Sequence, residues 1–537
     1  MKKIPVIDIF AGPGGLGEGF SNVFDSEGNR VFDIRLSIEK DAHAHETLEL
    51  RSFTRQFPKG KLPDEYYRMV QADNIKDRAE LKEKLYKAYP DECKHAKKEA
   101  WLCELGNKKF PDSKVDRKIK KALNGEKDWV LIGGPPCQAY SLVGRSRVGG
   151  IHEGDHRVHL YKQYLRIIAV HQPAVFVMEN VKGLLSASLN GEKIFNLIKR
   201  DLSSPSQVDE HKNTNCPDYK IYSLVKTADR DFEGNPVYSH DRDYLIQSEK
   251  YGVPQKRHRV ILLGVREDLD VIPDILPTVE KETTVKDVLH DLPKLRSSIS
   301  RRVKEVKYIK QDDGTTKKRR IYETIEDGSE RWKKEVNAFR EDIVTWNGFD
   351  VDVYKEQIEP SPIGNGSEFV ACELPENEGA IHKWYKDERL GGLPNHESRS
   401  HLLEDLKRYL FSSMFTKANG HFPKLHEYVD HAEDLLPDHD NAKSGKFNDR
   451  FRVQLPNKPA TTVTSHISKD GHYFIHYDYT QCRSFTVREA ARIQTFPDNY
   501  LFCGSRTAQF HQVGNAVPPF LAKQIGEVVR KLLVKRS

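Results

Sequence analysis

Two residues of this 537-residue chain stand where covalent chemistry would be expected. Cys137 lies in "GGPPCQ" directly after an apolar run, and the two prolines fix the backbone that carries the thiol. Glu179 lies near the end of a second apolar run, "VFVMENV", where a buried carboxylate is costly unless it has a partner. A lone cysteine more often packs as a small apolar side chain. The rigid backbone and the second reactive group favour a thiol nucleophile that works beside a carboxyl group.

Short apolar runs and helical patterns alternate over the first 265 residues, and these elements must position the two groups. The order of strands and helices predicts a doubly wound, Rossmann-like α/β domain with a parallel sheet. Ligands of such domains bind at the carboxyl ends of the strands, so Cys137 and Glu179 are expected to meet in one crevice. The predicted strands are 5–10, 32–39, 129–134, 174–181 and 259–265.

A glycine-rich loop, "DIFAGPGGLGEGF", follows the first predicted strand and precedes a helical pattern. Gly12, Gly14 and Gly17 would allow a tight turn and close approach of a ligand to the backbone. Glu39 ends the second predicted strand, where its carboxylate could accept hydrogen bonds from ribose hydroxyls, and Phe10 could cover an adenine ring. This pattern predicts a nucleotide-type site. Taken alone, it leaves NAD and S-adenosylmethionine both open, and with them a hydride-transfer enzyme.

Composition divides the remaining chain. Residues 76–127 are charged and predicted to be a helical insertion, and between about 270 and 475 the strand–helix alternation stops. Helical periodicity returns near the C-terminus. We therefore expect a catalytic domain over 1–268, a second domain over 269–478, and a segment, 479–537, that rejoins the first domain.

Charge and cysteine content narrow the class of protein. The net charge is +6, but residues 294–320 hold eleven Lys and Arg against three Asp and Glu. Such a run is either a solvated loop or a surface that contacts phosphates. None of the seven cysteines forms a C-x-x-C pair, which argues against disulfides and structural zinc. No apolar run approaches the roughly 20 residues that span a bilayer, so a cytoplasmic protein without a membrane partner is expected.

Five histidines gather in the second domain, within 36 residues of sequence. Without cysteines at a ligand spacing, a structural or DNA-contacting role is favoured over zinc, and no metal site is predicted. These histidines are His396, His401, His421, His426 and His431.

Six ordered blocks resemble the signature blocks of DNA (cytosine-5)-methyltransferases. They read "DIFAGPGG", "GGPPCQAYS", "MENV", "YGVPQKRHRV", "FTVREAARIQTFP" and "QVGNAVPP". They cover most of 4–40, 129–185, 250–266 and 480–530. The region between the fourth and fifth blocks is where this family places its variable target-recognition domain, and it coincides with the change in composition.

The resemblance implies a reaction and its residues. In the family, the thiolate that matches Cys137 adds to C6 of a cytosine flipped out of the duplex, and the carboxyl group that matches Glu179 hydrogen-bonds the N3 side of the base. Arg257 and Arg259 match arginines that hold the base, the phosphates and the catalytic loop. The DNA contacts implied in the same way are Gln138, Ser141, Arg145 and Gln255.

The resemblance also implies S-adenosylmethionine as the cofactor. The family's adenine-contacting block usually reads Gly-Asp-Ile, whereas this chain has "ADNI", so either Asp73 or Asn74 could face the adenine amine. The other residues carried over to the cofactor site are Phe10, Gly12, Gly14, Gly15, Leu16, Glu39, Pro135, Leu160, Asn515 and Ala516.

Other functions fit the sequence less well. A tRNA cytosine-5 methyltransferase can share every catalytic block, but the long recognition region favours double-stranded DNA. A catalytically silent DNA-binding protein would not need Cys137, Glu179 and Arg257, and a dehydrogenase explains neither "PPCQ" nor "ENV". We expect a monomeric bacterial enzyme, associated with the nucleoid, whose partner is a cognate restriction endonuclease that acts on the same site.

Overall fold

The computed structural model describes most of the chain. The described residues are 2–136, 156–189, 191–208, 215–310, 316–346, 349, 352–376, 379–431, 435–436 and 449–534. None of the helices in these ranges is long and apolar enough to cross a membrane. Cys137, Gln138, Ser141 and Arg145 lie outside the described residues.

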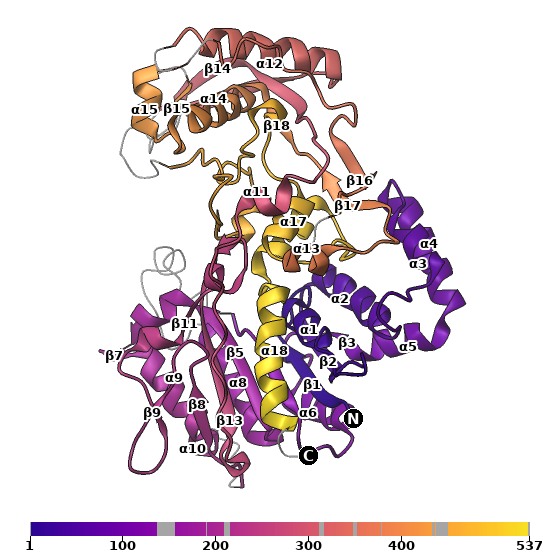
Figure 1. Ribbon diagram of the computed structural model, residues 1–537, viewed down its shortest axis with the longest axis vertical. Coiled ribbons are helices and arrows are strands. Elements are labelled where there is room, and N and C mark those ends of the chain that lie inside the picture. The colour runs from indigo at the N-terminus through magenta and orange to yellow at the C-terminus, as the bar shows by residue number, and fades with distance from the viewer. Residues whose placement is uncertain are drawn as a thin grey trace.

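A mixed sheet forms the centre of the first domain, with the strand order β11-β13-β5-β4-β1-β2-β3 and with β8 also paired to β13 (Figure 1). From β5 to β3 all neighbours are parallel. The strands are β1 (Ile4–Ile9), β2 (Phe32–Glu39), β3 (Ala100–Leu102), β4 (Val130–Gly133), β5 (Val175–Val181), β8 (Tyr219–Tyr222), β11 (Leu245–Gln247) and β13 (His258–Arg266).

One predicted strand has the opposite direction. The run at 259–265 was expected to be parallel, but β13 is antiparallel to β5, β8 and β11. The connection from β11 to β13 is only residues 248–257, without the long crossover that a parallel pair needs. A short connection of this kind reverses the chain, so β13 returns beside β11.

Helices cover both faces of the sheet, as the alternation predicts (Figure 1). Successive strand residues point to opposite faces, so Val6 packs with Phe20 and Ile525 in one core and Ile7 packs with Tyr164 in the other. The helices on the side of Val6 are α1 (Gly15–Ser21) and α18 (Pro519–Val534), and those on the side of Ile7 are α6 (Asp112–Leu123), α8 (His156–His171) and α9 (Ile194–Ser203).

The segment 76–127 is more than an insertion, because it contains β3, the strand at one edge of the sheet. The prediction of a helical insertion is therefore wrong for the residues of β3. Three residues, "AWL", are too few to show a strand pattern among the charged helical residues around them. The neighbouring helices are α2 (Ala42–Arg55), α3 (Asp64–Val70), α4 (Ile75–Ala88) and α5 (Pro90–Glu99).

The second half of the molecule has a core of its own, in which Trp332, Tyr409 and Met414 are fully buried. A long hairpin, β14 (Ser298–Lys310) and β15 (Thr316–Thr324), joins this core through β18 (Ser400–Leu402). The helices are α12 (Ser329–Ile343), α14 (Leu403–Asn419) and α15 (Leu425–His431), and a smaller sheet pairs β16 (Gly366–Ala371) with β17 (Gly392–Glu397).

Helices form two of the sets of contacts that join the halves. Helices α3 and α4 lie beside β16 and β17 (Figure 1), and Arg78 of α4 forms an ion pair with Glu368 of β16 at 2.6 Å. The C-terminal segment passes through α16 (Val487–Ile493) and α17 (Arg506–Asn515) and returns to the first domain as α18. There α18 packs so closely on α1 that a Cβ at Gly19 would clash with Ala522.

Candidate active site

The glycine loop after β1 is held in a shape that needs glycine. Gly12 and Gly14 have φ of 57° and 96°, and Gly14 is the N-cap of α1. A Cβ at Gly12 would meet nothing within 4 Å, so this side of the loop is open. A Cβ at Gly15 would clash with the carbonyl oxygen of Val517, and the hydroxyl of Tyr500 donates a hydrogen bond to the carbonyl of Pro13. The C-terminal segment therefore packs against one side of the loop, and the side at Gly12, the front of the loop, stays open.

Glu39 lies directly against this loop. Its carboxylate accepts hydrogen bonds from the backbone N–H of Gly12 at 2.7 Å and from those of Lys40 and Asp41 at 2.8 Å each. Burial raises the pKa of Glu39, while these three N–H groups lower it. The chain thus places an acidic group at the carboxyl end of β2, beside an open glycine, which suits the two hydroxyls of a ribose.

The other residues carried over to the cofactor site come from several elements. Leu16 begins the buried face of α1, and Leu160 is buried in α8. Phe10 is half-buried at the end of β1, with a positive φ of 55°, and Pro135 is buried two residues after β4. Asn515 is exposed at the end of α17, and Ala516 is buried beside it.

The structure corrects the expectation for Asp73 and Asn74. Both are exposed, and the side-chain oxygen of Asn74 caps α4 by accepting the N–H of Asp77 at 2.9 Å. The next strand of the sheet is β3, and the residues at its carboxyl end are Cys103, Glu104 and Leu105. The N–H of Cys103 donates to the carbonyl of Glu39 at 2.8 Å, so Glu104 follows directly beside the carboxyl end of β2.

Sequence analysis missed Glu104. The signal that could have found it is the acidic residue in "AWLCEL", which occupies the place after β3 that Glu39 occupies after β2. Its carboxylate contacts Asn107 at 2.7 Å and the amine of Lys40 at 3.4 Å.

Glu179 of β5 lies against the backbone that leads to Cys137. Gly133 pairs with Met178 across β4 and β5, and a Cβ at Gly134 would lie 2.9 Å from the carboxylate of Glu179. Gly134 is three residues before Cys137. A side chain other than glycine at 134 would therefore displace the carboxyl group from the edge of the sheet.

Arg259 of β13 holds this carboxylate. The guanidinium nitrogen Nε lies 2.6 Å from Oε1 of Glu179, and both side chains are largely buried. The strands make the pair possible, because Ile261 of β13 is paired with Glu179 and Arg259 therefore lies two residues along the same strand. A partly buried carboxylate thus has the cationic partner that its position requires.

Arg257 has a different place from the one expected. It is 2% exposed, and its Nη1 donates to the carbonyl oxygens of Val463 at 2.8 Å and Gly514 at 3.3 Å. Burial lowers the pKa of Arg257 well below its ordinary value, and the neighbouring charge of Arg259 lowers it further. The side chain therefore ties β13 to the C-terminal segment, close to the Arg259–Glu179 pair.

The structure also corrects the expectation that Gln255 contacts DNA. Its side chain is fully buried, and its amide nitrogen donates to the carbonyl of Ile493 at 3.1 Å. Its amide oxygen accepts the N–H of Val463 at 3.0 Å. Every polar atom of this side chain is used in joining three segments, so none is offered to a base or a phosphate.

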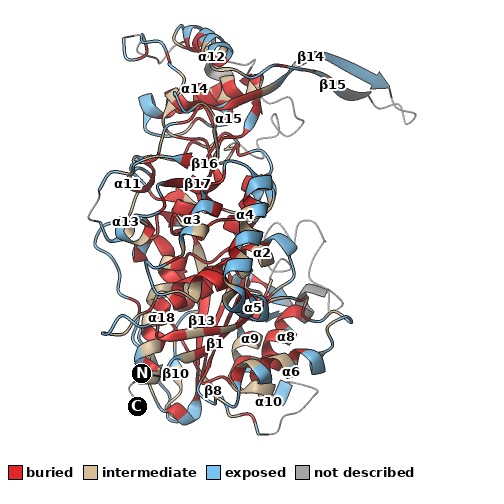
Figure 2. Ribbon diagram, turned by 90° about the vertical axis from the view of Figure 1, so that its right-hand side faces the viewer, coloured by how far each residue is buried: buried red, intermediate tan, exposed pale blue. Residues whose placement is uncertain are grey.

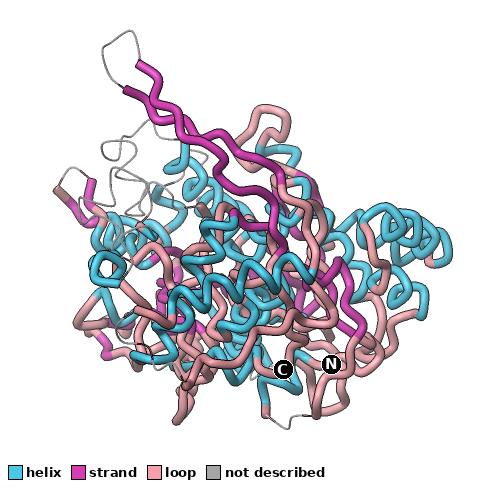
Figure 3. The backbone as a smooth tube through the Cα atoms, turned by 90° about the horizontal axis from the view of Figure 1, so that it is seen from above, coloured by secondary structure: helices cyan, strands magenta, loops and turns pink. Residues whose placement is uncertain are grey.

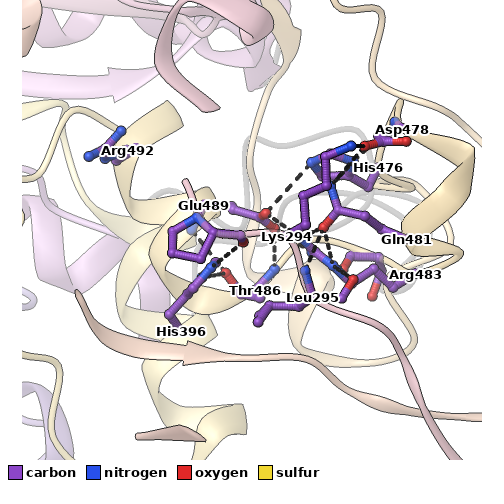
Figure 4. A network of polar contacts seen from close by, with 12 residues as sticks. Lys294, Leu295, His396, His476, Asp478, Gln481, Arg483, Thr486, Glu489 and Arg492 are labelled. Carbon is purple, nitrogen blue, oxygen red and sulfur yellow. Dashed lines mark hydrogen bonds and ion pairs between the residues drawn. The ribbon is translucent and has the colours of Figure 1, made fainter. Parts of the chain in front are cut away.

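The histidines of the second half do not converge on one point. His396 is buried and contacts Thr486 at 3.0 Å, in the polar network of Figure 4. His401 is buried beside Ser484, while His421 is exposed and pairs with Glu427 at 3.0 Å. Within the described ranges, no group of three or more His, Cys, Asp or Glu side chains is placed to hold a metal ion.

Known proteins are similar to this chain over most of its length. The family model described as C-5 cytosine-specific DNA methylase matches residues 94–221 and 238–531. Type II methyltransferase M.Bpa9945I of Bacillus paralicheniformis is 31% identical over 98% of this chain and 99% of its own. DNA (cytosine-5-)-methyltransferase M.ApeKI of Aeropyrum pernix is 27% identical over 76% of this chain and 83% of its own.

Among solved structures, a prophage-encoded protein of E. coli described as a DNA modification methyltransferase covers 99% of this chain and 100% of its own. The identity is 19% and the TM-score is 0.49, so the fold rests on the strand order above. The family match, in contrast, extends over most of the sequence and includes β4, β5 and β13. The chain therefore belongs to the C-5 cytosine-specific DNA methylases, and its cofactor is S-adenosylmethionine.

Proposed function

We propose that this protein transfers a methyl group to C5 of a cytosine that is flipped out of a specific duplex DNA sequence, through a covalent bond between Cys137 and C6 of the base. The observation that carries the proposal is the Glu179–Arg259 ion pair, which lies against Gly134 at the carboxyl ends of β4 and β5. A base in this crevice would have the carboxyl group on one side and the segment that carries Cys137 on the other.

The side chains divide the reaction between them. The sulfur of Cys137, as a thiolate, forms a bond to C6, and the electron pair of the C5–C6 double bond becomes available at C5. The carboxyl group of Glu179, carrying a proton, donates a hydrogen bond to N3 of the ring, where negative charge develops during this addition. S-adenosylmethionine, when bound, would supply an electrophilic methyl group: C5 would form a bond to the methyl carbon, the bond between that carbon and the sulfonium sulfur would break, and S-adenosylhomocysteine would be the leaving group. A base then removes the C5 proton, the electrons of that C–H bond restore the C5–C6 double bond, and Cys137 leaves as the thiolate.

The two arginines position these groups. Arg259 holds the carboxylate of Glu179 at 2.6 Å, so the carboxyl group keeps one orientation before a base arrives. Arg257 fastens the start of β13 to residues 463 and 514, which belong to the recognition region and the C-terminal segment. A cytosine bound here would therefore lie where these segments meet.

The residues of the nucleoside edge fit the cofactor. Glu39, held by three backbone N–H groups, would accept the ribose hydroxyls, and the open front of Gly12 would admit the adenosyl group. Glu104 would lie at the adenine. Phe10, Leu16, Pro135 and Leu160 would supply the apolar surroundings, with Asn515 and Ala516 at the methionine end.

We propose double-stranded DNA as the substrate, with the second half of the molecule as its reader. Both relatives named above are DNA or type II methyltransferases, which supports protection of a restriction site and a cognate endonuclease as partner. The tRNA alternative shares the catalytic blocks. The size of the second half, with its own core around Trp332 and Tyr409, favours the reading of a duplex. Gln138, Ser141 and Arg145 remain the proposed contacts of the loop after Cys137.

The decisive experiment replaces the nucleophile. Cys137→Ser should lower methyl transfer from labelled S-adenosylmethionine to plasmid DNA by more than about 10³-fold, because a serine hydroxyl is a far weaker nucleophile than a thiolate. Binding of the cofactor, measured by calorimetry, should be unchanged. Cys372→Ser, which alters a half-buried cysteine elsewhere, is the control and should retain activity.

Wild-type turnover by Cys137→Ser would overturn the mechanism, and transfer to tRNA but not to DNA would overturn the substrate. Bisulfite sequencing of DNA from cells that express the chain would show the methylated base and its sequence context. A duplex that contains 5-fluorocytosine at that position should trap the protein covalently, because C5 then has no proton to lose.

A further inference from the structure

The outer part of the β14–β15 hairpin projects from the second half of the molecule without packing against it. Figures 2 and 3 show the two strands extending past the body, and the outer residues are exposed in Figure 2. The base is anchored, because Ile299 and Ile325 belong to the buried core and the N–H of Val303 donates to Glu404 at 2.9 Å. Beyond this point an isolated two-stranded hairpin has little stability of its own in water.

The hairpin is strongly basic. The segment 298–324 contains nine Lys and Arg and four Asp and Glu, a net charge of +5 within a chain whose total is +6. Tyr308 is 68% exposed, and Val306 and Ile309 are exposed near it. A solvated ribbon would not need exposed apolar and aromatic side chains between its cations, whereas a ribbon that binds a polyanion could use both.

The strand register separates these charges into two faces. Residues directly opposite each other share a face, and alternate residues change faces. Arg301 pairs with Thr324, Val303 with Tyr322, Val306 with Arg320, and Lys310 with Thr316, so all of these lie on what we name the cationic face. The contact between Arg301 and the ring of Tyr322, at 4.5 Å, confirms that these two side chains share it. The members of the cationic face that the argument uses are Arg301, Tyr308, Lys310, Arg320 and Tyr322.

The opposite face carries both glutamates of the paired strands, Glu305 and Glu323. Arg302 forms an ion pair with Glu323, and Lys307 lies 3.6 Å from Glu305. This face, with Arg319, is therefore called the compensated face. On the compensated face, Arg302 and Lys307 thus each lie beside a glutamate.

We propose that the cationic face of the hairpin is an arm that binds the phosphates of duplex DNA outside the sequence read by the second half. The major groove, about 12 Å wide, admits a two-stranded ribbon. Residues 304–310 of β14 extend over roughly 23 Å at about 3.3 Å per residue, which corresponds to about seven phosphates along one strand. The arm thus lengthens the contact with DNA without reading bases. This inference rests on the proposed function, because it takes duplex DNA as the substrate.

The test compares two variants that lose the same charge. One carries Arg301→Gln and Lys310→Gln on the cationic face, and the other carries Arg302→Gln and Lys307→Gln on the compensated face. Binding to a 40-base-pair duplex of random sequence is measured by fluorescence anisotropy between 50 and 200 mM NaCl, with a duplex RNA of equal length as a second probe. Thermal unfolding checks that both variants are folded.

Each neutralised phosphate contact lowers the slope of log affinity against log salt by about 0.9. The cationic-face variant should therefore lose about 1.8 from this slope, and the compensated-face variant less than about 1. Equal losses in the two variants, no loss in either, or a stronger dependence with the RNA probe would overturn the proposal. Methyl transfer to plasmid DNA by the wild type is measured in parallel. The binding experiment therefore tests the arm, and the methyl-transfer assay separately tests the proposed function, so either proposal can be contradicted without the other.

Discussion

At the scale of single residues, the site depends on one carboxylate and the groups that hold it. Glu179 has Gly134 on one side and Arg259 on the other, and neither neighbour is close to it in sequence. Because an ion pair in a partly buried site has low freedom of movement, the carboxyl group is oriented before substrate binds. The same principle applies to Glu39, which three backbone N–H groups hold at the carboxyl end of β2.

Glu179→Gln should lower kcat on DNA by about 10²-fold, because a single group that stabilises developing charge contributes that much. Binding of S-adenosylmethionine should be unchanged, since Glu39 and the glycine loop are intact. Glu249→Gln is a matched control: Glu249 is buried and has one partner, His258 at 2.8 Å, on the same strand as Arg259. A fall of kcat that is equal in both variants would show a structural effect only.

At the scale of elements, α16 lies at the junction between the halves, where buried charged residues form a network of ion pairs and hydrogen bonds (Figure 4). Arg483 donates to both carboxylate oxygens of Glu489, at 2.6 and 2.7 Å, and Glu489 also closes the capping box of α16 with Thr486. Two histidines, His396 and His476, are buried against this pair. The block "FTVREAARIQ" therefore forms a helix whose polar residues are almost all inside.

The two buried histidines make stability depend on pH. Burial lowers the pKa of His396 and of His476 from the ordinary 6.5 to about 4. On acidification the unfolded chain takes up these protons first, so the free energy of unfolding should fall between pH 6.5 and 4, by up to about 1.4 kcal/mol per pH unit for each histidine. Above pH 6.5 this contribution is fully present.

Urea unfolding at several pH values checks this expectation. For His396→Asn, the free energy of unfolding should fall less steeply with decreasing pH than for the wild type. The difference in slope should correspond to about one proton. His421→Asn is the control, because His421 is exposed and Glu427 raises its pKa, so its removal should not flatten the fall. Identical slopes for the wild type and His396→Asn would contradict the assignment.

At the scale of the whole molecule, the contact of α3 and α4 with the second half gives part of 76–127 a role. Arg78 donates to Glu368 through Nη1 at 2.6 Å and to the carbonyl of Ala72 through Nη2 at 2.9 Å. Tyr67 of α3 contacts the carboxylate of Asp387 at 3.0 and 3.1 Å. These helices therefore support the second half on the side away from the strands that carry Glu179 and Arg259 (Figure 1).

Arg78→Met should lower the free energy of unfolding by about 3 kcal/mol, because it leaves the carboxylate of Glu368 largely buried without its partner. Arg78→Met combined with Glu368→Leu should recover most of this loss. Lys531→Met, which breaks an exposed pair with Asp274, should change stability by less than about 1 kcal/mol. Chemical denaturation of the four proteins, wild type included, measures these differences, and a double variant no more stable than Arg78→Met would exclude the pair as the cause.

Local sequence patterns were sufficient to predict much of the fold of this protein. The glycine loop, the acidic end of β2 and the apolar strands could be predicted because their residue types are required within a few positions of each other. The family resemblance rests on blocks of the same kind. The alternation of strands and helices likewise predicted that helices would cover both faces of the sheet.

What the sequence alone could not determine depends on contacts between distant segments. The three residues of β3 are a strand only because β2 pairs with them, and this pairing places Glu104, rather than Asp73 or Asn74, just after the strand next to β2. Gln255 lies in a family block, yet Ile493 and Val463 bury it. The separation of the basic run into two faces required the register of β14 and β15. In each case the partner is far away in sequence, so its effect enters only when the chain is folded.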